Sequence, residues 1–335
     1  MSADRLLPAG ACAGCRVDLA GGTLDIWPIG LLHAGASTVN VAIETAVEAW
    51  VEPRARGFAV RVGGHSFEAE TWETLVDRPD TRLAARIALA YGLPPAGLRL
   101  SSASPRGAGL GASSALAVAL VRAIERSLGR EPSTPDACAA LVRDLEAAMM
   151  ALPTGIQDQY PPLLGGVLVL RYCPGGAEVT RLDVDLEALG ARLVVTFSGQ
   201  SHISGDTNWQ IVRRRLDGES RVCQALDGIA AAAAAMPDAL VRSDWPAVGR
   251  LMSEDWRHRL TLAPEVSTPA LERLLRAAAE AGAWGGKVCG AGGGGSVAVL
   301  AAPERRGAVL RAMAAAGGVP VEASPRSAGV QSVNR

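Results

Sequence analysis

The sequence predicts an α+β protein of two domains. Its 335 residues are 49% hydrophobic, which is ample material for the cores of one large or two ordinary domains. Strand-like and helical patterns follow one another without the steady βαβ alternation of a doubly wound sheet. Near residues 185–190 the pattern changes, and the chain becomes mostly helical and rich in Ala and Arg. We therefore expect one domain over residues 1–187 and a second over residues 188–335.

The first part of the chain is expected to mix strands and helices. Apolar runs rich in Val, Ala and Ile indicate strands, and small or apolar residues at helical spacing indicate helices. Gly63-Gly64 marks a hairpin turn, and Pro153 ends a helix. The expected elements are strands at 16–20, 36–51, 98–102, 165–172 and 191–197, a hairpin at 58–70, and helices at 82–91, 113–128 and 136–150.

The second part is expected to be mainly helical. Residues 208–280 have a helical pattern that four prolines interrupt. A glycine-rich turn over 287–299 runs into the strand SVAVL, and an amphipathic helix is expected over 304–316 before a last strand and tail.

Composition excludes several classes of function. The formal net charge is −1 and aromatic residues make up 4%, so a nucleic-acid or acidic-membrane partner is not expected. No stretch reaches the ~18 apolar residues of a membrane-spanning helix, and the N-terminal residues lack the apolar run of a signal peptide. We expect a soluble, cytoplasmic protein, either a monomer or a homodimer.

The cysteines and histidines do not form a recognisable metal motif. Six cysteines in a chain of this length do not indicate a disulfide scaffold. Cys12 and Cys15 form a single CxxC, which leaves a zinc or redox site open as a minor alternative. The four histidines are scattered along the chain.

The stretch PRGAGLGASSALAVALVRAI, residues 105–124, predicts a phosphate site. Gly107, Gly109 and Gly111 allow the backbone to turn several N–H groups inward, and the following helix adds its unpaired N–H groups and its dipole. Ser113 and Ser114 open that helix and can reach a phosphate oxygen or a magnesium ion. The alternative is a glycine-rich loop that serine merely caps. A Walker A loop is excluded because no GxxxxGK[ST] occurs, and no dinucleotide fingerprint is present either.

Two further stretches carry candidate chemistry. KVCGAGGGGSVAVL, residues 287–300, has more glycines than one turn requires and could line the same site from the second domain. LEAAMMALPTGIQDQY, residues 145–160, places Glu146 on a helix and Asp158 in the loop after it. Carboxylates ligate magnesium, and an aspartate can accept a proton from an attacking hydroxyl. If this stretch stood alone, a solvated glutamate on a helix and an aspartate in a turn would be the favoured interpretation.

Three stretches in the same order resemble the GHMP small-molecule kinases. Residues 105–115 resemble the P-x-G-x-GLG-S-S-A signature, residues 287–296 the third motif, and CRVDLAGGTLDIWP (15–28) the first motif of that superfamily. RVDLAGG-x-x-D, GIQDQY and SHISGDTNW (201–209) look most like the fucose and heptose-phosphate kinase branch. The resemblance implies an N-terminal domain like ribosomal protein S5 domain 2, a ferredoxin-like C-terminal domain, and a cleft between them for ATP and sugar.

Carried over by position, the resemblance implies a role for each matching residue. Asp158 would be the catalytic base with Arg16 beside it, Ser113 and Glu146 would hold Mg²⁺, and Asp25 would bind sugar hydroxyls. The residues expected around ATP are Pro105, Gly107, Ala108, Gly109, Leu110, Gly111, Ala112, Ser113 and Ser114; those expected around the acceptor are Arg16, Gly22, Thr23, Asp25, Asp158, Gly292 and Gly293. Two positions depart from the family pattern: Ala112 replaces its first serine, and Gly22-Thr23 replaces the Glu-His pair of galactokinases.

The sequence therefore predicts an ATP- and Mg²⁺-dependent kinase that phosphorylates a sugar or sugar phosphate, with the anomeric hydroxyl as a candidate acceptor. Two alternatives remain: a kinase for a non-sugar alcohol such as mevalonate or homoserine, and a non-catalytic sugar sensor. The run Arg213-Arg214-Arg215 could clamp a substrate phosphate or be a solvated helix face.

Overall fold

The larger of two sheets forms the base of the N-terminal half. The computed structural model describes residues 6–201 and 205–334. The strands of this sheet run in the order β12-β1-β2-β5-β3-β4, β6 pairs with β2, and β7 pairs with β6. All pairs are antiparallel except β3 with β5. The bounds are β1 Ala9–Ala20, β2 Ser37–Pro53, β3 Phe58–Val62, β4 His65–Ala69, β5 Ala96–Ser102, β6 Val167–Cys173, β7 Gly176–Leu182 and β12 Gln331–Val333.

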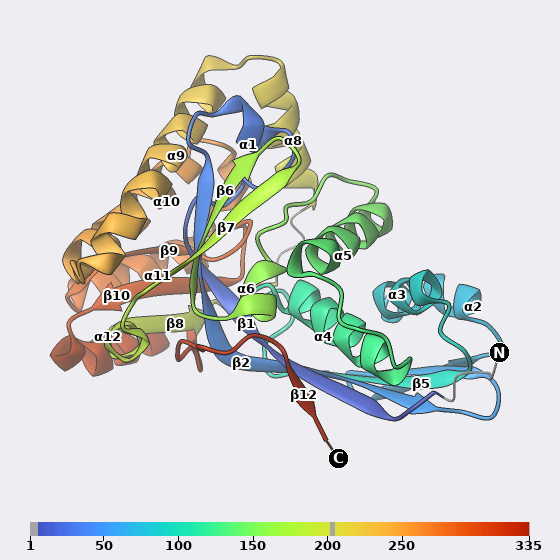
Figure 1. Cartoon of the computed structure of the whole chain (residues 1–335). Coiled ribbons are helices and arrows are strands. Elements are labelled where there is room, and N and C mark those ends of the chain that lie inside the picture. Colours follow the sequence, from blue (N-terminus) through green and yellow to red (C-terminus); the bar gives the residue numbers. More distant parts are fainter. Residues whose placement is uncertain (1–5, 202–204, 335) are drawn as a thin grey trace.

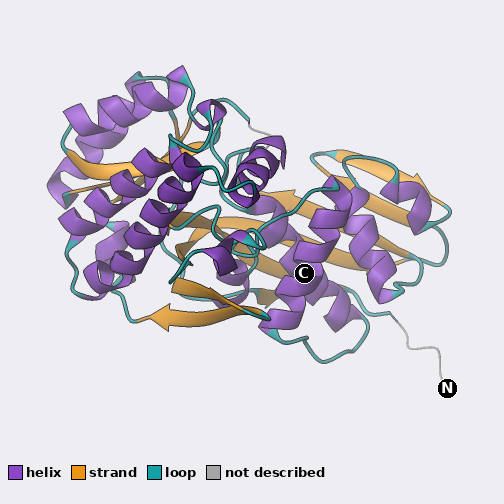
Figure 2. Cartoon of the chain, turned by 90° about the horizontal axis from the view of Figure 1, so that it is seen from above, coloured by secondary structure: helices purple, strands orange, loops and turns teal. Residues whose placement is uncertain are grey.

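Helices cover one face of this sheet (Figures 1 and 2). The helix α4 (Ala112–Ser127) packs on β1 and β2, and its Ala- and Val-rich sequence is buried on most sides because small side chains allow close approach. The first turn of α5 (Pro135–Met150) is capped by Thr134, whose hydroxyl accepts a hydrogen bond from the Ala137 amide at 3.2 Å. The other helices here are α2 Trp72–Val76, α3 Arg82–Tyr91 and α6 Tyr160–Leu164. The short helix α1, Ile29–Leu32, lies apart from them near β6, and Ile29 packs with Ile211 and Val222 (Figure 1).

The second sheet has four antiparallel strands in the order β11-β8-β10-β9. Numbered along the chain this order is 4-1-3-2, the order of a ferredoxin-like sheet, so the expected α+β fold with a ferredoxin-like second domain is confirmed. The strands are β8 Leu193–Phe197, β9 Ala283–Val288, β10 Ser296–Ala301 and β11 Val319–Val321; the helices are α7 Leu186–Gly190, α8 Gly205–Leu216, α9 Ser220–Val241, α10 Trp245–Arg259, α11 Pro269–Glu280 and α12 Pro303–Ala315, with a 3₁₀ turn at Pro264–Val266.

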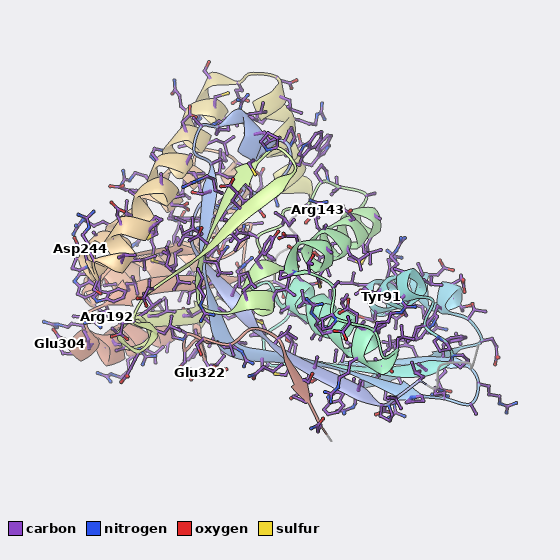
Figure 3. The ribbon with its side chains drawn as sticks, in the orientation of Figure 1. Tyr91, Arg143, Arg192, Asp244, Glu304 and Glu322 are labelled. Carbon is purple, nitrogen blue, oxygen red and sulfur yellow. The ribbon has the colours of Figure 1, made fainter. Side chains whose placement is uncertain are left out.

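Figure 3 places Arg192, Asp244 and Glu304 around this second sheet and Tyr91 and Arg143 on the helices over the first. Asp244 caps α10 by accepting a hydrogen bond from the Ala247 amide at 3.0 Å. Within the described residues, no helix has both the length and the apolar character that a membrane crossing requires.

Three differences from the expected elements bear on the site. The strand β1 begins at Ala9, seven residues before the run expected from Arg16, because its glycines, alanines and cysteines carry little β signal. Lys287 lies inside β9 rather than in the glycine-rich turn expected over 287–299. The last strand, β12, pairs with β1, so the end of the chain returns to the first sheet (Figure 1).

Candidate active site

The glycine loop between β5 and α4 lines a cavity of about 410 Å³. Gly111 is the N-cap residue of α4 at φ 68° and offers no side chain to the first-turn amides, which therefore remain available to an anion. A Cβ on Gly111 would lie 3.2 Å from the Arg16 side chain and 3.5 Å from that of Asp158. All nine residues expected around ATP line this cavity: Pro105, Gly107, Ala108, Gly109, Leu110, Gly111, Ala112, Ser113 and Ser114.

The second glycine loop follows β9 and closes the other side of this cavity. The Ser296 amide donates a hydrogen bond to the Ala108 carbonyl at 2.8 Å, which joins the two glycine loops directly. A Cβ on Gly109 would lie 2.5 Å from the Cys289 carbonyl oxygen, so only glycine permits this approach. Gly292 lines this cavity, whereas Gly293 lines neither this cavity nor the acceptor cavity described below, and its amide donates to the Val266 carbonyl at 2.6 Å.

Asp158 lies in the loop between α5 and α6 and forms an ion pair with Arg16. Arg16 Nε and Nη2 lie 2.9 and 2.7 Å from Asp158 Oδ1, and Arg16 also donates to the Gly109 carbonyl. Burial alone would lower the pKa of Arg16, but the carboxylates of Asp158 and Asp18 outweigh it and raise the pKa. The predicted pair is thus in contact, and the guanidinium fixes both the carboxylate and the glycine loop.

Glu146 is buried behind the start of α4. It accepts hydrogen bonds from Ser114 Oγ at 2.8 and 3.0 Å and from Gln159 Nε2 at 2.8 Å. Burial raises the pKa of Glu146 to about 7, and these donors and the Ser113 hydroxyl oppose the rise. Ser113 is exposed at the glycine-loop cavity. The sequence singled out Ser113 as the partner of Glu146, but the hydroxyl with the two short contacts is that of Ser114.

A magnesium ion at this position would have few protein ligands. Among the described residues, no three His, Cys, Asp or Glu side chains gather as a metal site. Magnesium commonly uses one or two protein carboxylates together with substrate phosphates and water. Glu146 and the two serine hydroxyls beside the phosphate-loop cavity fit that donor set.

A second, polar cavity of about 100 Å³ lies beside the first and is here called the acceptor cavity. Ser114, Asp158 and Ala291 border both cavities. Its other lining residues are Arg16, Thr23, Asp25, Ile26, Glu146, Thr154, Gly155, Gln157, Gln159, Asn208, Arg259 and Gly290. The predicted acceptor residues Arg16, Thr23, Asp25 and Asp158 thus meet here, whereas Gly22 is not among the lining residues.

Several buried polar atoms of the acceptor cavity have no hydrogen-bond partner among the described residues: Thr23 Oγ1, Gln157 Oε1, Gln159 Oε1, Asn208 Oδ1, and Nε and Nη1 of Arg259. Buried polar groups are normally hydrogen-bonded, so such a set points to a ligand that supplies the missing partners. The set contains both donors and acceptors, and a hydroxyl group can serve either.

Asp25 is held in place by the loop that follows α5. Its carboxylate accepts hydrogen bonds from the Gln157 amide and from Gln157 Nε2, both at 3.2 Å. Burial, helped by the charge of Asp158, raises the pKa of Asp25 to about 6. A Cβ on Gly155 would lie 1.6 Å from Asp25 Oδ2, so a side chain there would displace the carboxylate.

The only lysine of the chain lies behind the site, in a position that the sequence analysis missed. Lys287 is fully buried, with its Nζ 2.7 Å from Asp18 Oδ2 and 3.0 Å from Asp255 Oδ1. Asp18 Oδ1 also accepts a hydrogen bond from the Gly290 amide at 2.9 Å. Burial would raise the pKa of Asp18, but Lys287 and Arg16 lower it. The signal that could have found this cluster is the rarity of lysine combined with its position directly before the glycine loop.

The arginine run 213–215 does not point to a phosphate clamp. Arg214 pairs with Glu219, and Arg215 donates to His33 Nε2 at 2.7 Å and to the Leu32 carbonyl at 3.1 Å. Two of the three guanidinium groups are therefore used in contacts within the fold. Part of the SHISGDTNW stretch, residues 202–204, lies outside the described residues, while Asn208 lines the acceptor cavity.

Comparisons with known proteins agree with this geometry. The family model for the GHMP kinase N-terminal domain matches residues 81–166, and that for the C-terminal domain matches residues 236–319. A mevalonate kinase of Pyrococcus horikoshii is 31% identical over 247 residues, covering 72% of this chain and 70% of that protein. The chain belongs to the GHMP kinase family.

Other relatives lie in the sugar kinase branch. A D-glycero-α-D-manno-heptose 7-phosphate kinase of Campylobacter jejuni is 27% identical over 213 residues, and the match spans 62% of each protein. The crystal structure of a D-glycero-D-manno-heptose 1-phosphate kinase from Bacteroides thetaiotaomicron superposes with a TM-score of 0.77 at 21% identity, covering 98% of this chain and 99% of that one. This structural likeness supports the two-domain fold.

Proposed function

We propose that the chain is an ATP- and Mg²⁺-dependent kinase that transfers the γ-phosphoryl group of ATP to a sugar hydroxyl, with the anomeric hydroxyl as the first candidate. The observation that carries this proposal is the position of Asp158. Its carboxylate borders both the glycine-loop cavity and the acceptor cavity and is held there by Arg16. A base that serves phosphoryl transfer must stand where nucleotide and acceptor meet.

Phosphate binding, proton acceptance and metal binding fall to different residues of the site. The glycine loop and the first-turn amides of α4 bind the ATP phosphates. Asp158 accepts the proton of the acceptor hydroxyl while the new O–P bond forms and the bond to the ADP oxygen breaks, and Arg16 keeps the carboxylate in place. Ser113 and Glu146, with Ser114 beside them, would hold Mg²⁺, which supplies charge neutralisation of the transferred phosphoryl group.

The polar lining of the acceptor cavity favours a sugar. Asp25, the amide oxygens of Gln157 and Asn208 and the Thr23 hydroxyl offer hydrogen-bond positions around one small space, as a polyol requires. Sugar kinases are among the relatives, including the heptose 7-phosphate kinase and, at 30% identity over 213 residues, a bifunctional fucokinase/GDP-fucose pyrophosphorylase of Arabidopsis thaliana.

A second candidate is a kinase for a non-sugar alcohol, because several mevalonate kinases are also relatives, including the one from Pyrococcus horikoshii. A non-catalytic sugar sensor is less favoured, since Arg16, Asp158 and Glu146 are all present: Arg16 pairs with Asp158 as expected, and Glu146 accepts a hydrogen bond from Ser114 at the start of α4.

Measuring ADP release with ATP, Mg²⁺ and a panel of acceptors separates these candidates. The panel contains neutral hexoses, heptose and hexose phosphates, mevalonate and homoserine, and product NMR locates the new phosphate. We expect turnover with a sugar or sugar phosphate. Turnover with mevalonate or homoserine alone would contradict the sugar assignment, and acceptor binding without ADP release would favour the sensor.

A further inference from the structure

Arg259, at the end of α10, is a buried guanidinium without a fixed partner. The residue is 1% exposed and is among the largest fully buried side chains of the described chain. Its Nε and Nη1 atoms have no hydrogen-bond partner among the described residues, although a guanidinium carries five N–H donors. Such a group is costly to bury unless something pairs with it.

Within the described part of the chain, no ion pair joins Arg259 to Asp18 or Asp255, the carboxylates of the Lys287 cluster. Asp18 accepts from Lys287 Nζ and the Gly290 amide, and Asp255 accepts from the Gly21 amide at 2.7 Å and lies 3.0 Å from Lys287 Nζ. These contacts fix both carboxylates on Lys287 and the backbone. The guanidinium therefore keeps unpaired N–H donors, and the residue lines a cavity.

That cavity is the acceptor cavity and not the nucleotide cavity. Arg259 lines the former together with Thr23, Asp25 and Asn208, and it is not among the residues that line the glycine-loop cavity. Its Nη1 approaches Gly22 so closely that a Cβ there would lie 2.8 Å away. An anion bound by Arg259 would consequently belong to the acceptor and not to ATP.

We propose that Arg259 binds an anionic oxygen group that the acceptor carries in addition to the hydroxyl to be phosphorylated. This inference rests on the proposed kinase function and narrows its substrate class: for a sugar kinase, the acceptor is a sugar phosphate and not a neutral sugar. The carboxylate of a hydroxy acid is also an anionic oxygen group that Arg259 could bind. The test therefore includes such an acceptor, mevalonate, beside the sugar phosphates. Guanidinium groups suit both because their donors pair with oxyanions in defined directions.

The test compares wild type, Arg259→Gln, Arg259→Lys and the control Arg257→Gln. Arg257 is an exposed arginine two residues away on the same helix, so its variant removes the same charge outside the cavity. Each protein is assayed with heptose 7-phosphate, hexose 6-phosphates, the matching neutral sugars and mevalonate. Acceptor binding is also measured without ATP, by the shift in melting temperature and by calorimetry.

We expect Arg259→Gln to raise the KM and Kd for the anionic acceptor by about 10- to 150-fold, the range for a hydrogen bond to a charged group. The KM for ATP should change little in Arg259→Gln. For the anionic acceptor, the KM and Kd of Arg259→Lys should lie between those of wild type and Arg259→Gln, and those of Arg257→Gln should match wild type. Unchanged melting temperatures without acceptor show that the variants fold. If Arg259→Gln does not fold, Arg259→Lys decides the question by the same comparison of anionic with neutral acceptors.

The outcomes for the two proposals are distinguishable. Wild-type turnover of neutral sugars in preference to their phosphates, or an equal loss for neutral and anionic acceptors in Arg259→Gln, would overturn the anion site and leave the kinase standing. Arg259-dependent turnover of mevalonate would support the anion site and overturn the sugar assignment. If wild type turns over nothing, Arg259-dependent binding of the anionic compounds still supports the site, and its absence overturns it.

Discussion

At the scale of single residues, Asp158 is the most direct test of the chemistry. We expect Asp158→Asn to lower kcat by about 10²–10⁴-fold, the usual contribution of a general base, with the KM for ATP nearly unchanged. Steady-state kinetics with varied ATP and acceptor measures both. Asp144→Asn is the control because it removes an exposed carboxylate that pairs with Arg143 on the surface of α5. A loss below about tenfold would indicate a mechanism without a base.

Asp25 should give the folded protein a characteristic pH dependence. The pKa of its carboxyl rises from 3.8 to about 6 in the fold, so the folded state binds the proton more tightly than the unfolded state. The resulting stabilisation is complete below about pH 4 and is lost as pH rises through 6. Because one pKa unit corresponds to about 1.36 kcal/mol, the stabilisation by protonated Asp25 amounts to at most about 3 kcal/mol.

Denaturant unfolding of wild type and Asp25→Asn at intervals from pH 4 to 7.5 measures this effect. The free energy of unfolding of wild type minus that of Asp25→Asn should fall across this window. Other acidic groups titrate in both proteins and cancel in the difference. A constant difference would show that the fold does not perturb Asp25.

At the scale of elements, the two ends of α4 allow structure to be separated from function. Gly111 begins the helix at φ 68° and Gly129 follows its end at φ 65°, so alanine is strained at either position by about 1–2 kcal/mol. A Cβ on Gly111 meets Arg16 and Asp158, whereas one on Gly129 meets nothing within 4 Å. We expect both alanine variants to lose similar stability, and only Gly111→Ala to lose kcat and ATP affinity strongly. Thermal unfolding measures the stability of the two variants, and steady-state kinetics measures their kcat and KM for ATP. If Gly111→Ala and Gly129→Ala had the same kcat and KM, a catalytic role for the loop would be contradicted.

The elements also show where sequence reasoning succeeds. The helices α3, α4, α5 and α12 agree with prediction within a residue or two, because periodicity and Pro or Gly at their ends mark them locally. The strands β7, β9 and β12 were not predicted as such. Their exposed or glycine-containing sequences carry little local signal. Pairing determines them instead: β7 pairs with the adjacent β6, β9 with β10, and β12 with the distant β1.

The residues of the site divide in the same way: local motifs mark some of them, and the fold alone brings the others together. The glycine loops, Arg16, Glu146 and Asp158 stand in recognisable motifs, and these three side chains and residues of both loops line the two cavities. Lys287 stands at the start of the third motif, but Asp255 and Arg259 of α10 stand in no recognised motif. Only the fold brings Lys287 and Asp255 together with Asp18, so the sequence did not reveal this cluster or the place of Arg259 in the cavity.

At the scale of the whole molecule, Lys287 connects the two domains through charge. Its ammonium group, on a strand of the second sheet, pairs with Asp18 of β1 in the first sheet and with Asp255 of α10, and all three side chains are fully buried. Removing one member of a buried ion pair leaves an uncompensated charge and costs about 3–5 kcal/mol. The loss should fall on the contact between the domains, where Lys287 meets Asp18, beside a hydrophobic core that side chains of both sheets share.

We therefore expect Lys287→Met to lower the free energy of unfolding by about 3–5 kcal/mol. Urea unfolding followed in parallel by tryptophan fluorescence and far-UV circular dichroism should place the midpoint of the variant at a lower urea concentration than that of wild type with both probes. Arg242→Met is the control because it breaks an exposed pair with Asp238, for which about 0–1 kcal/mol is expected. The triple variant Asp18→Asn, Lys287→Met and Asp255→Asn, which removes both carboxylates with the ammonium, should recover part of the loss. If Lys287→Met unfolds like Arg242→Met, the buried cluster does not stabilise the domain contact.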